Sequence, residues 1–316
     1  MPREIRHFCP HSLVEVTQVT FQNRPLLRPS QRFNELFLGV LGRAQARFTM
    51  PLCGVVVLST HYHLLAVPRN PEHLARFMHF LATNLSKEIG RLRDWQGQLW
   101  QKRYNLVPVS NEEKAQVKRL RYLLAAGVKE GLVDQVAHWP GIHSARHLIE
   151  DRPLVGHWFD RTAEYIARQR KRPTKAKDFV HEERVFLSPL PCWRHLASNI
   201  WRRHISDLVQ NIEAEATEER QISGRKSLGA QRILTADPIR RPTEVKKSPK
   251  PRYHAVSREA HRQWFEAFAE VLRAYRQASA ALRAGDRWVS FPEGTFPPAL
   301  PFVPFSPSPL ARDHPA

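Results

Sequence analysis

Hydrophobic and polar residues in the first half of the chain alternate between strand-like and helix-like patterns. The β-branched run at 12–21 predicts a strand, and apolar residues at helical spacing predict a helix at 29–47. The run at 53–68 is too long and too rich in β-branched residues for one strand. It predicts two adjacent antiparallel strands that turn near Ser59 and Thr60.

A long helix is expected next, because Asn70 and Pro71 supply a polar cap followed by proline at the first helical position. Another strand is predicted within 97–109, and Ser110 and Glu113 have the spacing of a capping box before a further helix. The order strand, helix, two strands, helix, strand, helix predicts an α+β fold. We expect a ferredoxin-like antiparallel sheet with helices on one face, followed by a basic, mainly helical extension.

Composition changes after about residue 155 and suggests three parts. They are a first domain at 1–155, a basic helical extension at 156–290 with a proline-punctuated linker at about 222–255, and an irregular proline-rich tail at 291–316. Within the extension, helices are expected at 193–221 and 256–284. The run "RQRKRPTKAKD" at 168–178 indicates either a charged linker or a segment that binds phosphate groups.

The charge of the chain favours a polyanionic partner. Lys and Arg number 49 against 30 Asp and Glu, which gives a formal net charge of +19. Nucleic acid is the usual partner of such a surface, and a solvated basic surface or an anionic membrane remains the alternative. Three scattered cysteines favour neither disulfides nor a cysteine-rich zinc site, and no signal peptide or membrane span is visible. A reducing cytoplasm fits this use of cysteine.

Two histidines in "STHYHLLAV" have the spacing of neighbours on one face of a strand. His61 and His63 would converge, while Tyr62 would point to the opposite face. Two neutral imidazoles side by side supply half of a divalent metal site. The alternative is a pair of partly buried histidines that bond to backbone or water.

Tyr122 lies in the helix predicted to follow Ser110, nearly opposite the apolar stripe of that helix. The stripe consists of Val117, Leu120, Leu124 and Val128. Lys118, Arg119 and Arg121 surround the tyrosine with positive charge, which would attract a phosphate group. Tyr122 is therefore a candidate nucleophile, and the alternative is an ordinary surface tyrosine among solvated cations.

Together these residues resemble the single-tyrosine HUH transposases of the REP-associated kind. The matching pieces, in the order of that family, are "VEVTQVTFQNRPLL", "THYHLLAVP", "GQLWQKRY", "RYLLAAGVKEGLV" and "HWPGIHSARHL". They cover roughly residues 8–150, about half of the chain. The two-histidine element by itself is weak evidence for this family, whereas the ordered set of pieces is fairly specific for it.

The resemblance implies a ferredoxin-like domain that cleaves and rejoins single-stranded DNA beside a hairpin. His61 and His63 would hold Mg²⁺ or Mn²⁺ on the scissile phosphate, and Tyr122 would attack it to leave a 5′-phosphotyrosine and a free 3′-hydroxyl. Lys102 and Arg103 could line the path of the DNA, as could the three cations around Tyr122. Whether the chain is a monomer or a homodimer is left open.

One position departs from the family pattern. The family usually places an amide side chain one helical turn after the tyrosine as a third metal ligand, and Ala126 stands there. Glu130 could substitute only if the helix axis points at the metal. The alternative function is therefore a catalytically inactive, transposase-derived protein that binds DNA hairpins. A basic RNA-binding or ribosome-associated protein is a third interpretation. His143 and His147 lie four residues apart, and we expect both to have a structural role.

Overall fold

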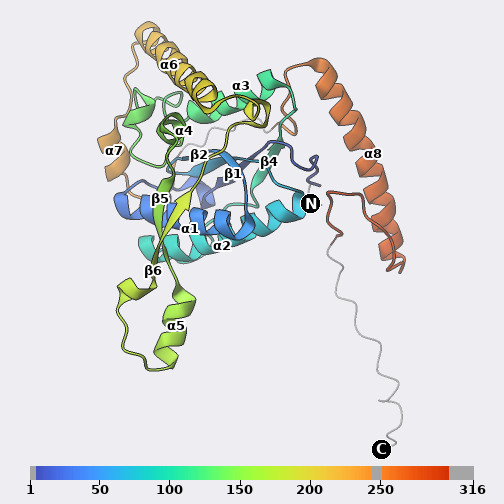
Figure 1. Cartoon of the computed structure of the whole chain (residues 1–316), viewed down its shortest axis with the longest axis horizontal. Helices are drawn as coiled ribbons and strands as arrows, with labels where there is room; N and C mark the ends of the chain where they lie inside the picture. The colour runs from blue at the N-terminus through green and yellow to red at the C-terminus, as the bar shows by residue number, and fades with distance from the viewer. Residues whose placement is uncertain (1–4, 244–250, 299–316) are drawn as a thin grey trace, which may run out of the picture.

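The computed structural model describes residues 5–243 and 251–298, so most of the predicted proline-rich tail lies outside the described residues. Figure 1 shows a central sheet covered by helices, a narrow projection that carries α5, and the long helix α8 at one side of the body. None of the described helices combines the length and the apolar character needed to cross a bilayer.

The sheet has four antiparallel strands in the order β2-β3-β1-β4. Its strands are β1 (Val14–Val19), β2 (Leu52–Val57), β3 (His61–Ala66) and β4 (Asn105–Pro108), and the helices between them are α1 (Gln31–Phe48) and α2 (Pro71–Arg93). This order is the ferredoxin-like arrangement, so the predicted α+β class is confirmed. The predicted pair of strands within 53–68 is also confirmed, because β2 and β3 pair directly across residues 58–60.

Helices α1 and α2 begin at polar caps and cover one face of the sheet. The side chain of Ser30 accepts from the backbone N–H of Phe33 at 3.2 Å, and that of Asn70 accepts from His73 at 2.8 Å. Each cap satisfies a backbone donor that the first helical turn leaves free. The apolar stripes of both helices then pack with the core-facing residues of the strands, including Tyr62, which is fully buried.

The opposite face of the sheet is also covered, by α3 (Glu113–Leu124), α4 (Ala145–Glu150) and α6 (Ser198–Ser223). The predicted capping box before α3 is wrong, because the hydroxyl of Ser110 donates to the carboxylate of Glu112 at 2.6 Å. The same carboxylate accepts from the backbone N–H groups of Val256 and Ser257, both at 3.0 Å. Glu112 thus ties the start of α3 to the segment that leads into α8.

The second half of the chain contains strands that the sequence pattern did not predict. A hairpin of β5 (Leu154–Phe159) and β6 (Val180–Val185) carries α5 (Arg161–Gln169) at its end, so residues 168–178 belong to the tip of this hairpin. The remaining helices are α7 (Ala230–Thr235) and α8 (Arg258–Arg283), and the short 3-10 helices are η1 (Phe21–Asn23), η2 (Val136–His138), η3 (Ala176–Phe179) and η4 (Pro191–Trp193). The division into domains at residues 155 and 290 stays a prediction.

Candidate active site

The two histidines of β3 lie side by side on the face of the sheet that α3 covers. Their ring centroids are 4.9 Å apart. Tyr62 points to the other face, where its ring packs edge-on against Phe37 and Trp100. The alternation of the strand therefore separates a packing residue from two imidazoles that converge.

A buried carboxylate on the neighbouring strand orients one of these rings. Nδ1 of His63 lies 2.7 Å from Oε1 of Glu15, whose residue is 1% exposed, and 3.1 Å from the hydroxyl of Thr17. Because an ionised carboxylate only accepts, Nδ1 carries the proton, and the lone pair of the neutral ring remains on Nε2. This carboxylate–histidine pair is the arrangement that orients metal-binding imidazoles.

Arg119 compensates the charge of that buried carboxylate. Its guanidinium forms an ion pair with Oε2 of Glu15, and only 11% of its side chain is exposed. Arg119 was predicted to contact DNA, and its side chain lies largely buried beside Glu15, so that contact stays a prediction. The sequence pattern did not identify Glu15, since its role depends on the register that pairs Thr17 with His63.

Tyr122 lies beside this pair of histidines. Its ring centroid is 6.0 Å from that of His63, and Cζ of Arg119 is 4.8 Å from the centre of the tyrosine ring. The residue is 41% exposed, so a large ligand can reach it from solvent. The three residues proposed from the sequence for metal binding and attack are thus brought together, with the tyrosine at the open side.

Two further charged residues lie at the site because α3 ends earlier than expected. The helix stops at Leu124, and Gly127 adopts a φ of +92° that directs the chain back toward the tyrosine. Nζ of Lys129 lies 3.3 Å from the centre of the Tyr122 ring. The carboxylate of Glu130 accepts from the backbone N–H of Gly127 at 2.5 Å and lies 3.4 Å from the Lys129 ammonium.

Burial keeps both histidines of the site neutral near pH 7. Loss of hydration lowers the pKa of His61 to about 3, and the neighbouring His63 and Lys129 add to that shift. Burial likewise lowers the pKa of His63 to about 4, with Lys129 lowering it further. Neutral imidazoles are the form that binds metal ions, so no proton must leave either ring first.

Position 126 is buried. Ala126 is 3% exposed and packs in the apolar cluster under α3, beyond the end of the helix. Glu130 follows the turn at Gly127 and lies near enough for its charge to act on His63. The altered helix end therefore changes which side chain can approach the histidines.

The remaining cations predicted to contact DNA have different surroundings. Lys102, Arg103 and Lys118 are exposed. Arg121 forms an ion pair with Glu215 of α6 and therefore helps to join α3 to that helix. Lys102 also contributes its backbone carbonyl, which accepts from the side-chain amide of Gln18 at 2.7 Å.

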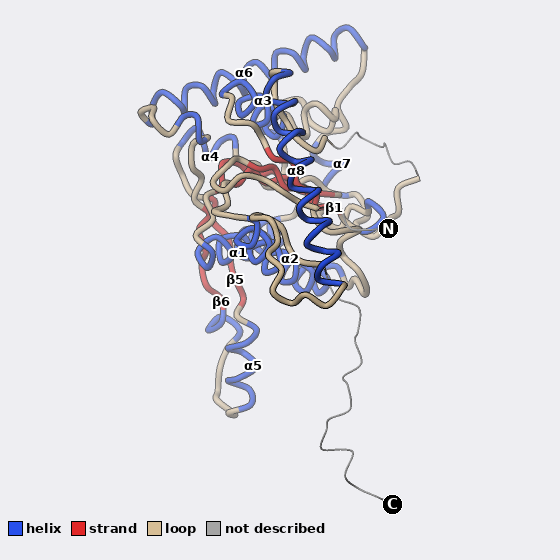
Figure 2. The backbone as a smooth tube through the Cα atoms, turned by 90° about the vertical axis from the view of Figure 1, so that its right-hand side faces the viewer, coloured by secondary structure: helices blue, strands red, loops and turns tan. Residues whose placement is uncertain are grey.

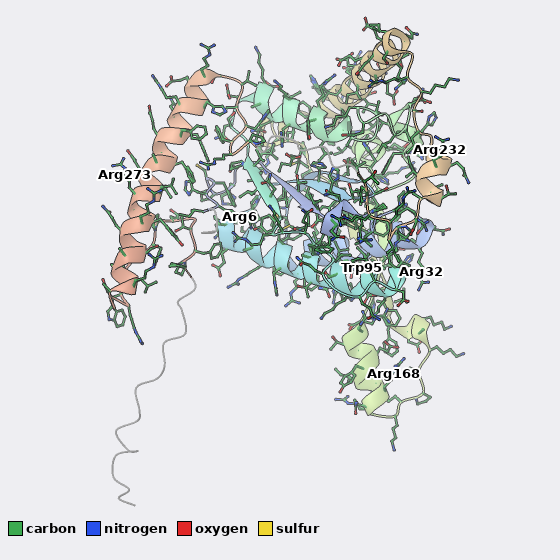
Figure 3. The ribbon with its side chains drawn as sticks, turned by 180° about the vertical axis from the view of Figure 1, so that it is seen from behind. Arg6, Arg32, Trp95, Arg168, Arg232 and Arg273 are labelled. Carbon is green, nitrogen blue, oxygen red and sulfur yellow. The ribbon has the colours of Figure 1, made fainter. Side chains whose placement is uncertain are left out.

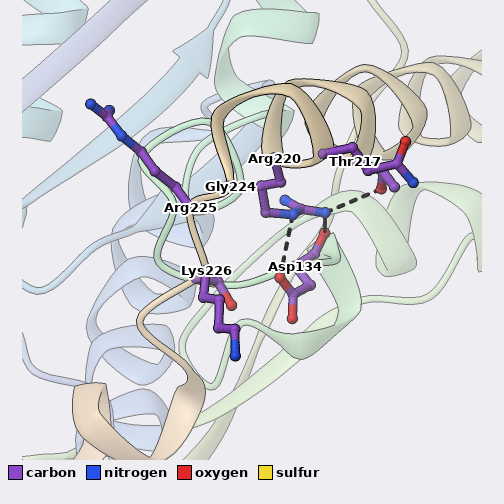
Figure 4. A pocket seen from close by; sticks show the side chains of 8 residues that line it. Asp134, Thr217, Arg220, Gly224, Arg225 and Lys226 are labelled. Atoms are coloured by element: carbon purple, nitrogen blue, oxygen red, sulfur yellow. Dashed lines mark hydrogen bonds and ion pairs between the residues drawn. The ribbon is translucent and has the colours of Figure 1, made fainter.

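An open cleft of about 570 Å³ lies at the end of α6. Figure 4 shows Arg220 turned toward Asp134 and Thr217, and its guanidinium donates to the carbonyl of Asp134 at 3.2 Å. Just beyond this cleft, the backbone of Leu228 donates to the carbonyl of Gly131 at 2.8 Å. The segment after α6 thus supports the loop that carries Lys129 and Glu130.

The donor set fits part of a divalent metal site. Within the described residues, the hydrogen bonds of both rings use Nδ1, to Thr60 for His61 and to Glu15 and Thr17 for His63, which leaves Nε2 of each ring for a ligand. No group of three or more His, Cys, Asp or Glu side chains in the described part of the chain is arranged to hold a metal ion. Phosphate and water oxygens would have to complete the coordination.

Comparisons with known proteins give matches only at the level of structure. No family model matches the chain, and no curated protein does. The chain is similar to a REP-associated tyrosine transposase bound to a REP hairpin, with 16% identity and a TM-score of 0.41 over 48% of this chain and 86% of that one. It is also similar to a protein of Deinococcus radiodurans described as a transposase, with 18% identity and a TM-score of 0.27 over 38% of this chain and 95% of that one.

Proposed function

We propose that this protein cleaves and rejoins single-stranded DNA beside hairpins, with Tyr122 as the nucleophile. The observation that carries this proposal is the position of the Tyr122 ring beside His63, with cationic groups of Arg119 and Lys129 over it. A tyrosine that served only for packing would not be 41% exposed next to two neutral histidines. The ordered motifs shared with single-tyrosine HUH transposases support the same reaction.

In the proposed step, the phenol of Tyr122 loses its proton to solvent and its oxygen attacks the phosphorus of a phosphodiester. A bond forms between phosphorus and the tyrosine oxygen, and the bond from phosphorus to the 3′ oxygen breaks. That oxygen takes a proton and leaves as a 3′-hydroxyl, while the 5′-phosphate stays on the protein. Attack by a 3′-hydroxyl on the phosphotyrosine reverses these changes and rejoins the strand.

Residues around the tyrosine would stabilise the negative charge of this reaction. Lys129 lies closest to the ring and is about one-third exposed, so it can turn toward a bound phosphate. His61 and His63 would hold Mn²⁺ or Mg²⁺ through Nε2, and Mn²⁺ suits two imidazoles better than the strongly oxygen-preferring Mg²⁺. Such an ion polarises the phosphate and stabilises charge on the departing oxygen.

A second candidate function is DNA-hairpin binding without cleavage. The observation that favours it is the burial of Ala126, which leaves the histidines without the amide ligand usual in the family. Losing a ligand weakens metal binding and loosens its geometry. The two functions share the DNA partner and differ only in whether a covalent adduct forms.

The test mixes the full chain with labelled single-stranded hairpin DNA from beside its own gene, in the presence of Mn²⁺. A denaturing gel then detects any covalent protein–DNA adduct. The proposal predicts an adduct that is absent in Tyr122→Phe and is suppressed by a chelator. Tight binding by both proteins without an adduct would favour the binding-only function.

A further inference from the structure

Residues 160–179, between β5 and β6, form a projection that we call the basic arm. Figures 1 and 2 both show it extending away from the sheet and its covering helices. Arg168 lies on this arm, away from the body of the molecule (Figure 3). The arm contains α5 and η3, and most of its residues are exposed.

The hairpin that carries the basic arm is packed tightly against the body. Gly39 of α1 and Gly156 of β5 lie so close that a Cβ on either would collide with the backbone of the other element. At the base of the arm, the guanidinium of Arg161 donates to both carboxylate oxygens of Glu88 in α2, at 2.9 and 3.1 Å. The arm therefore has a defined direction relative to the sheet, unlike a charged linker.

The charge of the arm is strongly positive and largely uncompensated. It contains seven Lys and Arg against three Asp and Glu. Arg161 and Arg168 form ion pairs with glutamates. Five cations have no carboxylate partner within residues 5–243 and 251–298, and all five are exposed: Arg170, Lys171, Arg172, Lys175 and Lys177.

The chemistry of this surface fits the phosphates of a duplex. A cluster of cations on a narrow projection can follow a phosphate backbone, and such contacts need no particular base sequence. Single-strand binding uses a series of aromatic platforms, whereas Tyr165 is the one aromatic residue of the arm that is strongly exposed among the described residues. Insertion into a membrane surface would need a broad apolar face, and the arm offers mainly Tyr165 and Ile166.

We propose that the basic arm binds the phosphate backbone of double-stranded DNA, without sequence preference and apart from the cleavage site. The hairpin packs on α1, which covers the sheet face opposite to His61 and His63. DNA held by the arm would therefore be a second contact on the far side of the molecule. This inference goes beyond the proposed function and does not require that Tyr122 cleave DNA.

The experiment measures binding of the full chain to a blunt duplex of random sequence, between about 50 and 200 mM salt. The arm variant changes Arg170, Lys171, Arg172 and Lys175 to Gln. A matched control changes four exposed arginines of the α8 region, Arg273, Arg276, Arg283 and Arg287, to Gln and so removes the same charge. Thermal melting confirms that both variants fold.

The arm variant should bind the duplex at least about tenfold more weakly at the lower salt concentration. The slope of log affinity against log salt should fall by about 0.9 for each phosphate that the variant no longer neutralises. Equal weakening in both variants would overturn the inference, since binding would then follow net charge alone. Arm-dependent binding to vesicles of anionic lipid with unchanged duplex affinity would also overturn it. Adduct formation on the labelled hairpin DNA with Mn²⁺, at saturating protein concentration, tests the proposed function separately and should be unaffected by the arm variant.

Discussion

The ammonium of Lys129 lies 3.3 Å from the centre of the Tyr122 ring, although the two residues belong to different local structures. Tyr122 lies within α3, and Lys129 follows the turn at Gly127 beyond the end of that helix. The contact places a positive charge over the ring whose oxygen would attack a phosphate.

We expect Lys129→Ala to slow adduct formation by about 10²- to 10³-fold, because a preorganised charge at the reacting atoms would be lost. The free energy of unfolding should change little, since the side chain is about one-third exposed. Single-turnover gels measure the rate. Lys114→Ala removes an exposed lysine of α3 as a control, and equal rates in both variants would contradict this role.

Glu15→Gln should weaken Mn²⁺ binding by about 10- to 100-fold, because the ring of His63 would lose the carboxylate that fixes its tautomer. It should also destabilise the fold by roughly 3–5 kcal/mol, since Arg119 would remain buried without its ion-pair partner. Calorimetric titration with Mn²⁺ and denaturant unfolding measure the two effects. Thr17→Val removes only the neighbouring hydroxyl and should have a much smaller effect on both. Unchanged Mn²⁺ affinity in Glu15→Gln would contradict the orienting role.

Ala126→Asn should not strengthen metal binding, although it restores the residue type that the family uses. The side chain at this position packs in the core, so an amide there should destabilise the fold by about 1–3 kcal/mol. Titration with Mn²⁺ and thermal melting would test both statements. A gain in Mn²⁺ affinity would show that the end of α3 can rearrange to present residue 126 to the histidines.

The protein should lose stability as the pH falls from about 6.5 to about 4. Part of this loss of stability should come from His143. In the folded protein its Nδ1 accepts from the backbone N–H of Ala145 and its Nε2–H donates to the carbonyl of Leu124, so the ring is held in its neutral form. Burial lowers the pKa of His143 to about 4 from an ordinary value of 6.5, so the unfolded chain binds a proton that the folded chain does not. Each such histidine contributes roughly 1.4 kcal/mol per pH unit in this window.

Urea unfolding at a series of pH values measures this effect. His143→Gln should reduce the dependence of unfolding free energy on pH between about 4 and 6.5. His61 and His63 should account for part of the dependence that remains, because burial also lowers their pKa values. Adding Mn²⁺ should further stabilise the wild-type protein above pH 6.5, where both rings are neutral. A stability profile that is flat between pH 4 and 6.5 would contradict the prediction.

Local patterns predicted the seven strands and helices from β1 to α3 and the central pair of histidines in the site. Alternation placed His61 and His63 on one face, and the predicted cap at Asn70 follows from its own short segment. Glu15 was missed because its contact depends on the register between β1 and β3, which local sequence does not determine. Lys129 was missed because the apolar stripe suggested a helix to Val128, whereas the helix ends at Leu124.

The hairpin that carries the basic arm was missed for a related reason. Its strands are separated by about twenty residues of helix and charged loop, so no tight-turn signal links them. One side of β6 is exposed and polar, as "VHEERV" shows, and its partner strand packs on α1 through a glycine instead of a large apolar residue. These features are only interpretable once both strands and the helix are placed together.

Both edges of the four-stranded sheet are protected by later parts of the chain. Along β2, the backbone of Ser144 donates to the carbonyl of Val55 at 2.9 Å, and that of Ser188 donates to the carbonyl of Leu52 at 2.7 Å. The outer strand β4 is only four residues long, ends in Pro108, and is followed by a bridge to His254. Short, covered and proline-terminated edges resist pairing with strands of other molecules. The four-stranded sheet is thereby protected from edge-to-edge pairing, so copies of this protein that associate would not extend it into a continuous sheet.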